Sequence, residues 1–274
     1  MRAAVVGHLE WVEFIRVDRL PQVGDIVHAG EWWEEPGGGG PGAAEQLRKL
    51  GADTIFFTAF GDDEFGHRAH DDLTRRGLRV EAVFRPEATR RAVTQIDNDG
   101  ERTITVLGER LAPSLDEPLA WHLLQEMDCV YFTAGDESAL TEARKARVLV
   151  ATSRALDVVR KTSVQLDALV GSSNDPSELH ERDELDPVPR LSVWTNGAEG
   201  GRFTVGAGPM SRYNPAPLPG RVGDRYGAGD SFAAGLTWGL GSNMEVDDAL
   251  KLAARCGAAV VAGRGPYETQ LEDP

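Results

Sequence analysis

The chain has few cysteines and a shortage of basic residues. Two cysteines, Cys129 and Cys256, occur among 274 residues, which argues against a disulfide-built scaffold and favours reduced thiols in the core of a cytoplasmic protein. Lysine and arginine number 29 against 44 aspartates and glutamates, and the formal net charge is −15. Such an acidic chain is a poor partner for nucleic acid or an anionic membrane. A nucleotide site on it must gather positive charge locally or use a metal ion.

Long apolar runs and metal-ligand patterns are missing as well. No stretch approaches the ~20 apolar residues that a membrane-spanning helix needs. Residues 1–7 read as a first strand, too short for the apolar region of a signal peptide. We therefore expect a cytoplasmic protein without a membrane partner. His67 and His70 share a helical spacing, but a solvated helix face explains that pair better than a metal site does.

What is present is a repeating alternation of apolar strands and amphipathic helices. Strands are expected at 3–6, 54–60, 129–133, 148–151, 168–170 and 191–195, a hairpin at 201–213, and helices at 43–50, 69–76, 117–126, 138–145, 153–159, 176–181, 229–240 and 247–262. This alternation predicts an α/β fold with a mostly parallel sheet and helices on both faces. Two β-rich stretches, residues 11–34 and 87–107, interrupt it, the second as a hairpin. We expect them to form a small β lid on a single domain, 1–274, whose core is 1–10, 35–86 and 108–274.

The segment around residues 227–232 offers the clearest chemistry. Gly227-Ala228-Gly229 is a tight turn, and an apolar helical stripe starts at Phe232. A helix N-terminus presents unpaired N–H groups and a partial positive charge, which suits an anion. Asp230, in the first turn, would lie beside that anion as a candidate base. An ordinary helix start capped by Asp230 or Ser231 is the alternative.

Two further glycine-rich segments allow a ligand to approach the backbone closely. Gly37–Gly40 precede the helix expected at 43–50, and the absence of a Lys-Ser/Thr pair excludes a Walker A loop. Thr195–Gly201 follow an apolar strand, where glycines suit a nucleotide that rests on the backbone. A loose turn is the alternative for the first segment, and a glycine-rich hairpin turn is the alternative for the second.

Four motifs in this order resemble those of the ribokinase-like, or PfkB-type, carbohydrate kinases. Asp224–Phe232 is similar to the family's C-terminal signature, Asp-Thr-x-Gly-Ala-Gly-Asp-x-Phe, and residues 36–52 are similar to its N-terminal signature. Phe60–Gly66 resembles the Gly-x-Asp-x-x-Gly element, and Thr195–Gly200 the nucleotide-site Thr-x-Gly-x-x-Gly. The resemblance covers nearly the whole chain and implies a ribokinase-like fold.

The resemblance implies a role for each motif. It makes Asp230 the base that takes the acceptor's proton, and it makes the amides of Gly227, Ala228 and Gly229 the anion hole for the transferring phosphoryl group. The residues implied at the nucleotide are Thr195, Gly197, Gly200, Asp224 and Gly257, and those implied at the acceptor are Gly38, Gly39, Gly40 and Gly42. For Asp224, an Asx-turn that caps the local backbone is an equal alternative.

The chain departs from the family where polar acceptor ligands are expected. The family's sugar-binding Asn falls at Gly42, and its Asp falls near Val12. Glu10 and Glu13 lie close to Val12 in the sequence and become candidate acceptor ligands. The identity of the acceptor therefore does not follow from the resemblance.

Together these residues predict an ATP-dependent kinase that transfers the γ-phosphoryl group to a hydroxyl of a small carbohydrate-like acceptor. The family's Asn-x-x-Glu, which helps to order Mg²⁺, has become Ser172 and Asp175, or its glutamate is displaced to Glu178. Asp175 is the candidate metal ligand, and a monovalent cation is a further candidate cofactor. The altered motifs leave a second reading, a catalytically impaired ligand-binding or regulatory protein of the same fold.

The expected lid carries three tryptophans, Trp11, Trp32 and Trp33. A sheet of few strands needs a partner surface, and aromatic side chains are common in interfaces. Lids of the resembled family often pair between two subunits. We therefore expect a homodimer through the lid, with packing of the tryptophans inside one chain as the alternative.

Overall fold

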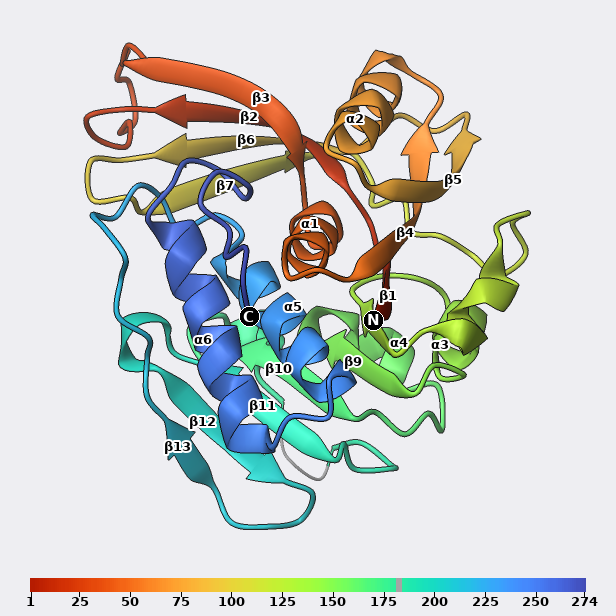
Figure 1. Cartoon of the computed structure of the whole chain (residues 1–274). Coiled ribbons are helices and arrows are strands. Elements are labelled where there is room, and N and C mark those ends of the chain that lie inside the picture. The colour runs from red at the N-terminus through yellow and green to blue at the C-terminus, as the bar shows by residue number, and fades with distance from the viewer. Residues whose placement is uncertain (181–183) are drawn as a thin grey trace.

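A nine-stranded sheet forms the centre of the protein in the computed structural model, which describes residues 1–180 and 184–274 (Figure 1). The strands lie in the order β13-β12-β11-β10-β9-β8-β1-β4-β5. Their bounds are β1 Arg2–Val6, β4 Asp53–Gly61, β5 Arg79–Arg85, β8 Cys129–Phe132, β9 Val148–Thr152, β10 Ala168–Ser172, β11 Leu191–Thr195, β12 Gly201–Val205 and β13 Ser211–Tyr213. Neighbours pair in parallel except at β12 and β13, which extend the sheet beyond β11 as an antiparallel hairpin. The predicted α/β fold is confirmed.

Long helices cover one face of this sheet, and short ones cover the other. The long ones are α1 Pro41–Lys49, α2 Glu64–Arg75, α5 Ala228–Gly241 and α6 Val246–Val261, and the short ones include η1 Trp121–Glu126, α3 Glu137–Ala143, η2 Ser153–Ala155 and α4 Leu156–Val159. α2 begins after Asp63, whose side chain accepts a hydrogen bond from the Gly66 amide at 2.8 Å. Pro41 opens α1, at a position where its missing N–H leaves no helical bond unmade.

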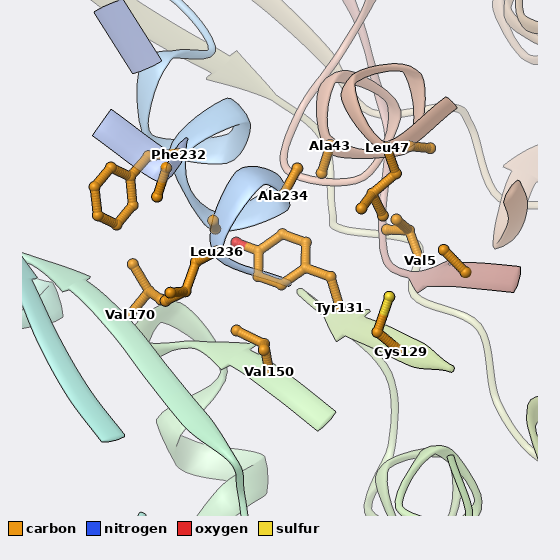
Figure 2. Packing of buried hydrophobic residues seen from close by; sticks show 14 of the residues in the cluster. Val5, Ala43, Leu47, Cys129, Tyr131, Val150, Val170, Phe232, Ala234 and Leu236 are labelled. Atoms are coloured by element: carbon orange, nitrogen blue, oxygen red, sulfur yellow. The ribbon is translucent and has the colours of Figure 1, made fainter. Parts of the chain in front are cut away.

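The core strands are apolar on both faces because helices cover each one. Val5 of β1 belongs to the cluster under the long helices, whereas its neighbour Val6 belongs to the cluster with η1, α3 and α4. Successive residues of a strand point to opposite faces, which explains this division. Figure 2 shows the first cluster, with Tyr131 of β8 facing Leu236 of α5.

A second, four-stranded sheet forms a lid, in the order β3-β2-β6-β7 (upper left in Figure 1). Its strands are β2 Glu10–Arg16, β3 Glu31–Gly37, β6 Arg91–Ile96 and β7 Arg102–Leu107. β2 continues from β1 after only three residues, 7–9, and it pairs in parallel with β6. The two β-rich stretches of the sequence therefore meet in one sheet that is joined directly to the central strand.

Two of the three lid tryptophans pack within their own chain. Trp11 is buried, and Trp33 stacks on Phe14 with ring centroids 4.9 Å apart. The guanidinium of Arg264, which follows α6, lies 4.9 Å from the centroid of the Trp33 ring. Trp32 is 68% exposed. Packing inside one chain thus accounts for Trp11 and Trp33 but not for Trp32.

Short elements differ most from the sequence-based expectations. The helix expected at 117–126 is a 3₁₀ helix, η1, and the one at 153–159 is a 3₁₀ turn followed by the four residues of α4. The helix expected at 176–181 is a 3₁₀ turn, η3 Pro176–Glu178, and residue 181 lies outside the described residues. Segments this short gain little from cooperative helix formation. β5 was not expected, because its alternating charges give a half-exposed edge strand no continuous apolar run.

Both cysteines are free and buried. Within residues 1–180 and 184–274, no helix combines the length and the apolar character that crossing a membrane requires.

Candidate active site

Polar residues from distant parts of the chain gather at the carboxyl ends of the parallel strands. His8 and Glu10 follow β1, Thr133 follows β8, and Arg154 follows β9. β1 lies between β4 and β8, where the strand order changes direction. Ligands of open α/β sheets bind at such a switch point, outside the carboxyl ends of the strands. The topology therefore predicts a ligand site beside β1 and β8.

The start of α5 leaves its first amides available. Gly227 has a φ of +77°, which glycine adopts without strain. The amides of Ala228, Gly229 and Asp230 precede the first intrahelical donor, Ser231, whose N–H reaches the Gly227 carbonyl at 2.9 Å. Gly229 is exposed, and a Cβ placed there would meet no described atom within 4 Å beyond its own turn of helix. This helix end can receive an anion from solvent.

Asp230 lies in the same turn and is partly buried. Burial is the main cause that raises the pKa of Asp230 to about 7. The positive charge of Arg154 lowers this pKa, and the negative charge of Glu178 raises it further. An ordinary aspartate has a pKa of about 4 and is a weak base at neutral pH. A carboxylate that titrates close to the working pH is better suited to accept a proton during a reaction.

The glycine run before α1 packs against this carboxylate. A Cβ on Gly39 would lie 3.5 Å from Oδ1 of Asp230 and 3.2 Å from Oγ1 of Thr133. A Cβ on Gly40 would collide with the ring of Phe56. The run is therefore a closely packed loop, not the loose turn that was its alternative, and it brings Gly39 beside the candidate base.

Asp224 holds the turn before α5 in place. Its Oδ1 accepts a hydrogen bond from the Tyr226 amide at 2.8 Å, and its Oδ2 accepts one from the Gly265 amide at 2.7 Å. The Tyr226 hydroxyl in turn accepts a hydrogen bond from the Gly38 amide at 2.9 Å. Asp224 thus forms the Asx-turn that was the alternative to a nucleotide contact. These bonds connect the anion-binding turn to the glycine run.

Of the two glutamates expected at the acceptor, Glu10 faces the site and Glu13 does not. Oε1 of Glu10 lies 3.1 Å from Nε of Arg90 and 3.7 Å from Nε2 of His8, and the residue is buried. Burial opposes ionisation, but these contacts lower the pKa of Glu10, so it is a carboxylate. Glu13 is three residues along β2, on the opposite face, where it pairs with Arg91 at 2.6 Å.

The two positions where the family carries polar acceptor ligands are apolar here. Val12 is fully buried in the cluster that contains Tyr226. A Cβ on Gly42 would lie 3.5 Å from Cβ of Pro266, and the Gly42 carbonyl accepts a hydrogen bond from Nε2 of Gln270 at 2.7 Å. Gly42 therefore packs under the segment that follows α6, and among the described residues its nearest side-chain neighbours are Pro266 and Gln270 and not Asp230.

The residues expected at the nucleotide lie at the end of β11 and along α6. Thr195 ends β11, and Gly197 and Gly200 have φ values of +52° and +80° in the turn into β12. A Cβ on Gly200 would collide with the backbone of β13, so the hairpin itself requires this glycine. A Cβ on Gly257 would lie 3.2 Å from the Ala228 carbonyl oxygen, which places α6 close against the start of α5. Close helix packing is therefore sufficient to explain Gly257.

The carboxylates after β10 already have partners. Oδ1 of Asp175 accepts a hydrogen bond from the Ser177 amide at 2.9 Å, and Arg154 lies 3.4 Å from its other oxygen. Glu178 is buried and accepts hydrogen bonds from the Ser172 amide at 2.9 Å and from Nε of Arg154 at 2.5 Å. Among the residues that the structure describes, no three or more His, Cys, Asp or Glu side chains form a group that could hold a metal. A metal at this site would need ligands from a bound molecule.

The positive charge at the site comes from arginines that were not predicted. Arg90, Arg102, Arg110 and Arg154 come from four separate segments, and their charges act on Glu10, on Asp230 or on one another. The acidic composition had indicated that local positive charge was needed. Nothing in the spacing of these arginines shows that they converge.

The sequence is similar to known carbohydrate kinases along its length. The family model described as pfkB family carbohydrate kinase matches residues 2–169 and 151–273. The chain is 28% identical over 294 residues to an ATP-dependent ribose-1-phosphate kinase of Halopiger xanaduensis, with 100% of this chain and 96% of that protein covered.

Solved structures show the same fold. A microbiome-derived acarbose kinase gives a TM-score of 0.82 at 22% identity, over 98% of this chain and 95% of that one. A ribokinase of Cryptococcus neoformans in complex with ADP gives a TM-score of 0.77 at 22% identity, over 98% and 96%.

Proposed function

Because the chain belongs to the pfkB family of carbohydrate kinases, we propose that it transfers the γ-phosphoryl group of ATP to a hydroxyl of a small carbohydrate-like acceptor. The observation that carries this proposal is the position of Asp230, which lies in the first turn of α5 and against Gly39. The ADP bound to the Cryptococcus ribokinase and the name of the Halopiger enzyme support ATP as the phosphoryl donor.

Each part of the site has a task in this reaction. The acceptor oxygen attacks the γ-phosphorus while the bond from that phosphorus to the β–γ bridging oxygen breaks, and ADP leaves. The proton of the attacking hydroxyl passes to the carboxylate of Asp230. The amides of Gly227, Ala228 and Gly229 surround the charge that spreads over the transferring group. Such positioned proton transfer typically contributes ~10²–10⁴-fold to the rate.

The nucleotide would lie over Thr195, Gly197, Gly200 and Gly257, of which Gly257 lies against the start of α5. Mg²⁺ is usually held by substrate phosphates and water with one or two carboxylates. Asp175 and Glu178, both already bonded to Arg154, fit a contribution through water. When bound, Mg²⁺ would neutralise charge on the β- and γ-phosphates.

The relatives are named for different acceptors, so their names do not identify the acceptor of this chain. The apolar surroundings of Val12 and Gly42 support an acceptor that is not bound as ribose is bound by family members with polar ligands there. Leaving such hydroxyls unpaired would cost about 1–3 kcal/mol each. Efficient turnover of ribose, with a kcat/KM of about 10⁴ M⁻¹s⁻¹ or more, would contradict this part of the proposal.

A phosphoryl-acceptor screen tests the function. ADP release would be measured with ATP and Mg²⁺ against sugars, sugar phosphates, polyols and nucleosides, with and without potassium to test for a monovalent cation. Asp230→Asn is the control, and we expect its kcat to fall by ~10²–10⁴ while nucleotide affinity is kept. Turnover of the variant within about threefold of the wild type on the true acceptor would remove Asp230 from the mechanism. Since ATP is the donor, we also propose that the reaction takes place in the cytoplasm.

A further inference from the structure

A cavity of about 180 Å³ opens beside Thr133, next to the proposed catalytic centre. Its walls come from three segments: residues 133–135 after β8, residues 154–158 around α4, and Arg110 with Ala112 after β7. This volume is well above the roughly 10–15 Å³ that one buried water requires. Ala155 of its wall packs in the cluster of α3 and α4, whereas α5 packs in the cluster on the other face of the sheet. No residue of 227–230 lines the cavity, so the cavity is distinct from the anion hole of α5.

Two arginines, Arg110 and Arg154, line this cavity, and the charge of Arg90 acts on Arg110. Arg154 pairs with Glu178, and Arg90 pairs with Glu10. Arg110 makes no hydrogen bond or ion pair with any residue in the described part of the chain. Arg110 is open to solvent at the cavity wall. Desolvation and the charges of Arg90 and Arg154 lower the pKa of Arg110 and outweigh the opposing charge of Glu10, so a bound anion would be favoured there.

Thr133 connects the cavity to the candidate base. Its side chain is 2% exposed, and its Oγ1 has no hydrogen-bond partner among the described residues. A buried hydroxyl without a partner is unfavourable, so a ligand that bonds to it would be favoured. The Cβ position of Gly39 lies 3.2 Å from this Oγ1 and 3.5 Å from Oδ1 of Asp230. One sugar ring is enough to reach from the cavity to the base.

A carboxylate in the wall does not cancel this positive charge. The Asp157 side chain is 94% exposed and lies 3.3 Å from the Arg160 guanidinium. The whole chain carries a formal charge of −15 and would repel an anionic acceptor. Local arginines are therefore what an anionic acceptor needs at this site.

Resting on the proposed kinase function, we propose that the acceptor is a monosaccharide phosphate whose phosphate occupies this cavity while a hydroxyl of its sugar reaches Asp230. The guanidinium groups of Arg110 and Arg154 match phosphate oxygens in geometry and charge. Thr133 donates its hydroxyl proton to the same phosphate. A neutral sugar can bond to Thr133 but forms no ion pair with Arg110 or Arg154.

Matched pairs of acceptors test the proposal. kcat/KM would be measured for D-ribose against its 1- and 5-phosphates, and for D-fructose against its 1- and 6-phosphates, with D-gluconate as a carboxylate of similar size. We expect at least one phosphate to exceed its parent sugar by about 100-fold or more, since two charged hydrogen bonds are gained. A parent sugar that matches its phosphates, or gluconate as the best acceptor, would overturn the phosphate assignment.

Variants locate the phosphate. Arg110→Ala should reduce the ratio of kcat/KM between the preferred phosphate and its parent sugar by about 10- to 100-fold. Thr133→Val should reduce the same ratio, and Thr133→Ser should restore most of it. Arg75→Ala is the matched control, because Arg75 lies on α2 and its side chain is 72% exposed. An Arg110→Ala variant with an unchanged ratio would rule out this cavity.

The two proposals can fail separately. If sugars and sugar phosphates are phosphorylated equally well, the kinase function stands and the cavity assignment falls. If nothing is phosphorylated although ATP binds, the kinase proposal fails. Calorimetric titration of the sugar phosphates into the ADP-bound wild type and Arg110→Ala would then still decide the second question, because equal affinities would overturn the anion site.

Discussion

In the proposed mechanism Asp230 must be ionised when the acceptor binds, yet burial favours its neutral form. Its pKa of about 7 predicts that kcat/KM rises about tenfold per pH unit below pH 7 and levels off above it, because only the carboxylate accepts a proton. Initial rates from pH 5.5 to 8.5 would show this acid limb. A phosphorylated acceptor has a titration of its own near pH 6.

The control for that profile is the residual activity of Asp230→Asn. A limb that comes from the substrate would persist in this variant, and the limb that comes from Asp230 would vanish. A wild-type profile that is flat from pH 5.5 to 8.5 contradicts the assignment of Asp230 as the base.

The same carboxylate makes stability depend on pH. In the unfolded chain its pKa is about 4, and in the folded protein it is about 7. Between these values the folded state holds a proton that the unfolded state has lost, so the contribution of Asp230 to stability is full below pH 4 and is lost as the pH rises through 7. We expect the melting temperature of Asp230→Asn, relative to that of the wild type, to be a few degrees higher at pH 8 than at pH 5. Scanning calorimetry without nucleotide measures the melting temperatures of the wild type and of Asp230→Asn at each pH. If the variant differs from the wild type by the same amount at pH 5 and at pH 8, the pKa of Asp230 is not raised.

At the scale of elements, Asp224 joins the start of α5 to the segment after α6. Asp224→Ala would leave the buried amides of Tyr226 and Gly265 without an acceptor, at about 1–3 kcal/mol each. Asp224→Asn keeps one acceptor and should lose less. Urea denaturation should therefore give the wild type the highest free energy of unfolding, Asp224→Asn a lower one and Asp224→Ala the lowest. Asp273→Ala, at an exposed position, is the control and should leave the free energy of unfolding unchanged. An Ala variant within about 0.5 kcal/mol of the wild type, the usual range of surface substitutions, would show that the turn is held by other contacts.

Elements with a strong local pattern could be predicted from the sequence, and those without one could not. The glycine turn before Asp230 and the run of Gly37–Gly40 are local signals, and both segments lie at the proposed site. The expected helix at 176–181 was wrong because its polar residues serve a single 3₁₀ turn, in which Asp175 caps the Ser177 amide. Glu13 was expected at the acceptor together with Glu10, but the two are three positions apart along β2, an odd offset that places them on opposite faces of the strand.

The arginines at the site could not be predicted from the sequence. Arg90, Arg110 and Arg154 are brought together only by the parallel pairing of β2 with β6 and by the common edge where β8 and β9 end. In the sequence, no local pattern distinguishes any of these arginines from an ordinary surface residue. Their convergence depends on strand order, which no single segment specifies.

At the scale of the whole molecule, assembly through the lid stays a prediction. Trp32 is exposed, as are Val23 and Ile26 in the loop between β2 and β3. We expect light scattering at micromolar concentration to give about twice the chain mass of 29.7 kDa, and Trp32→Ser to give the single-chain mass. Trp33→Ser should instead lower stability, because Trp33 stacks on Phe14 inside the chain. A wild-type species of single-chain mass would contradict the dimer.

The position of Trp33 also gives the protein an internal optical probe. The indole belongs to the lid, its N–H donates to Glu35 at 3.0 Å, and the cation above its ring belongs to the core segment after α6. Indole emission responds to nearby charge, so any shift of the lid relative to that segment changes the fluorescence of this one side chain. β2 follows β1 after three residues, 7–9, and begins at Glu10. A ligand that binds His8 or Glu10 therefore contacts the start of the lid sheet. We therefore expect acceptor binding to change the contribution of Trp33 to the emission of the six tryptophans, and stopped-flow fluorescence would measure this change without a label.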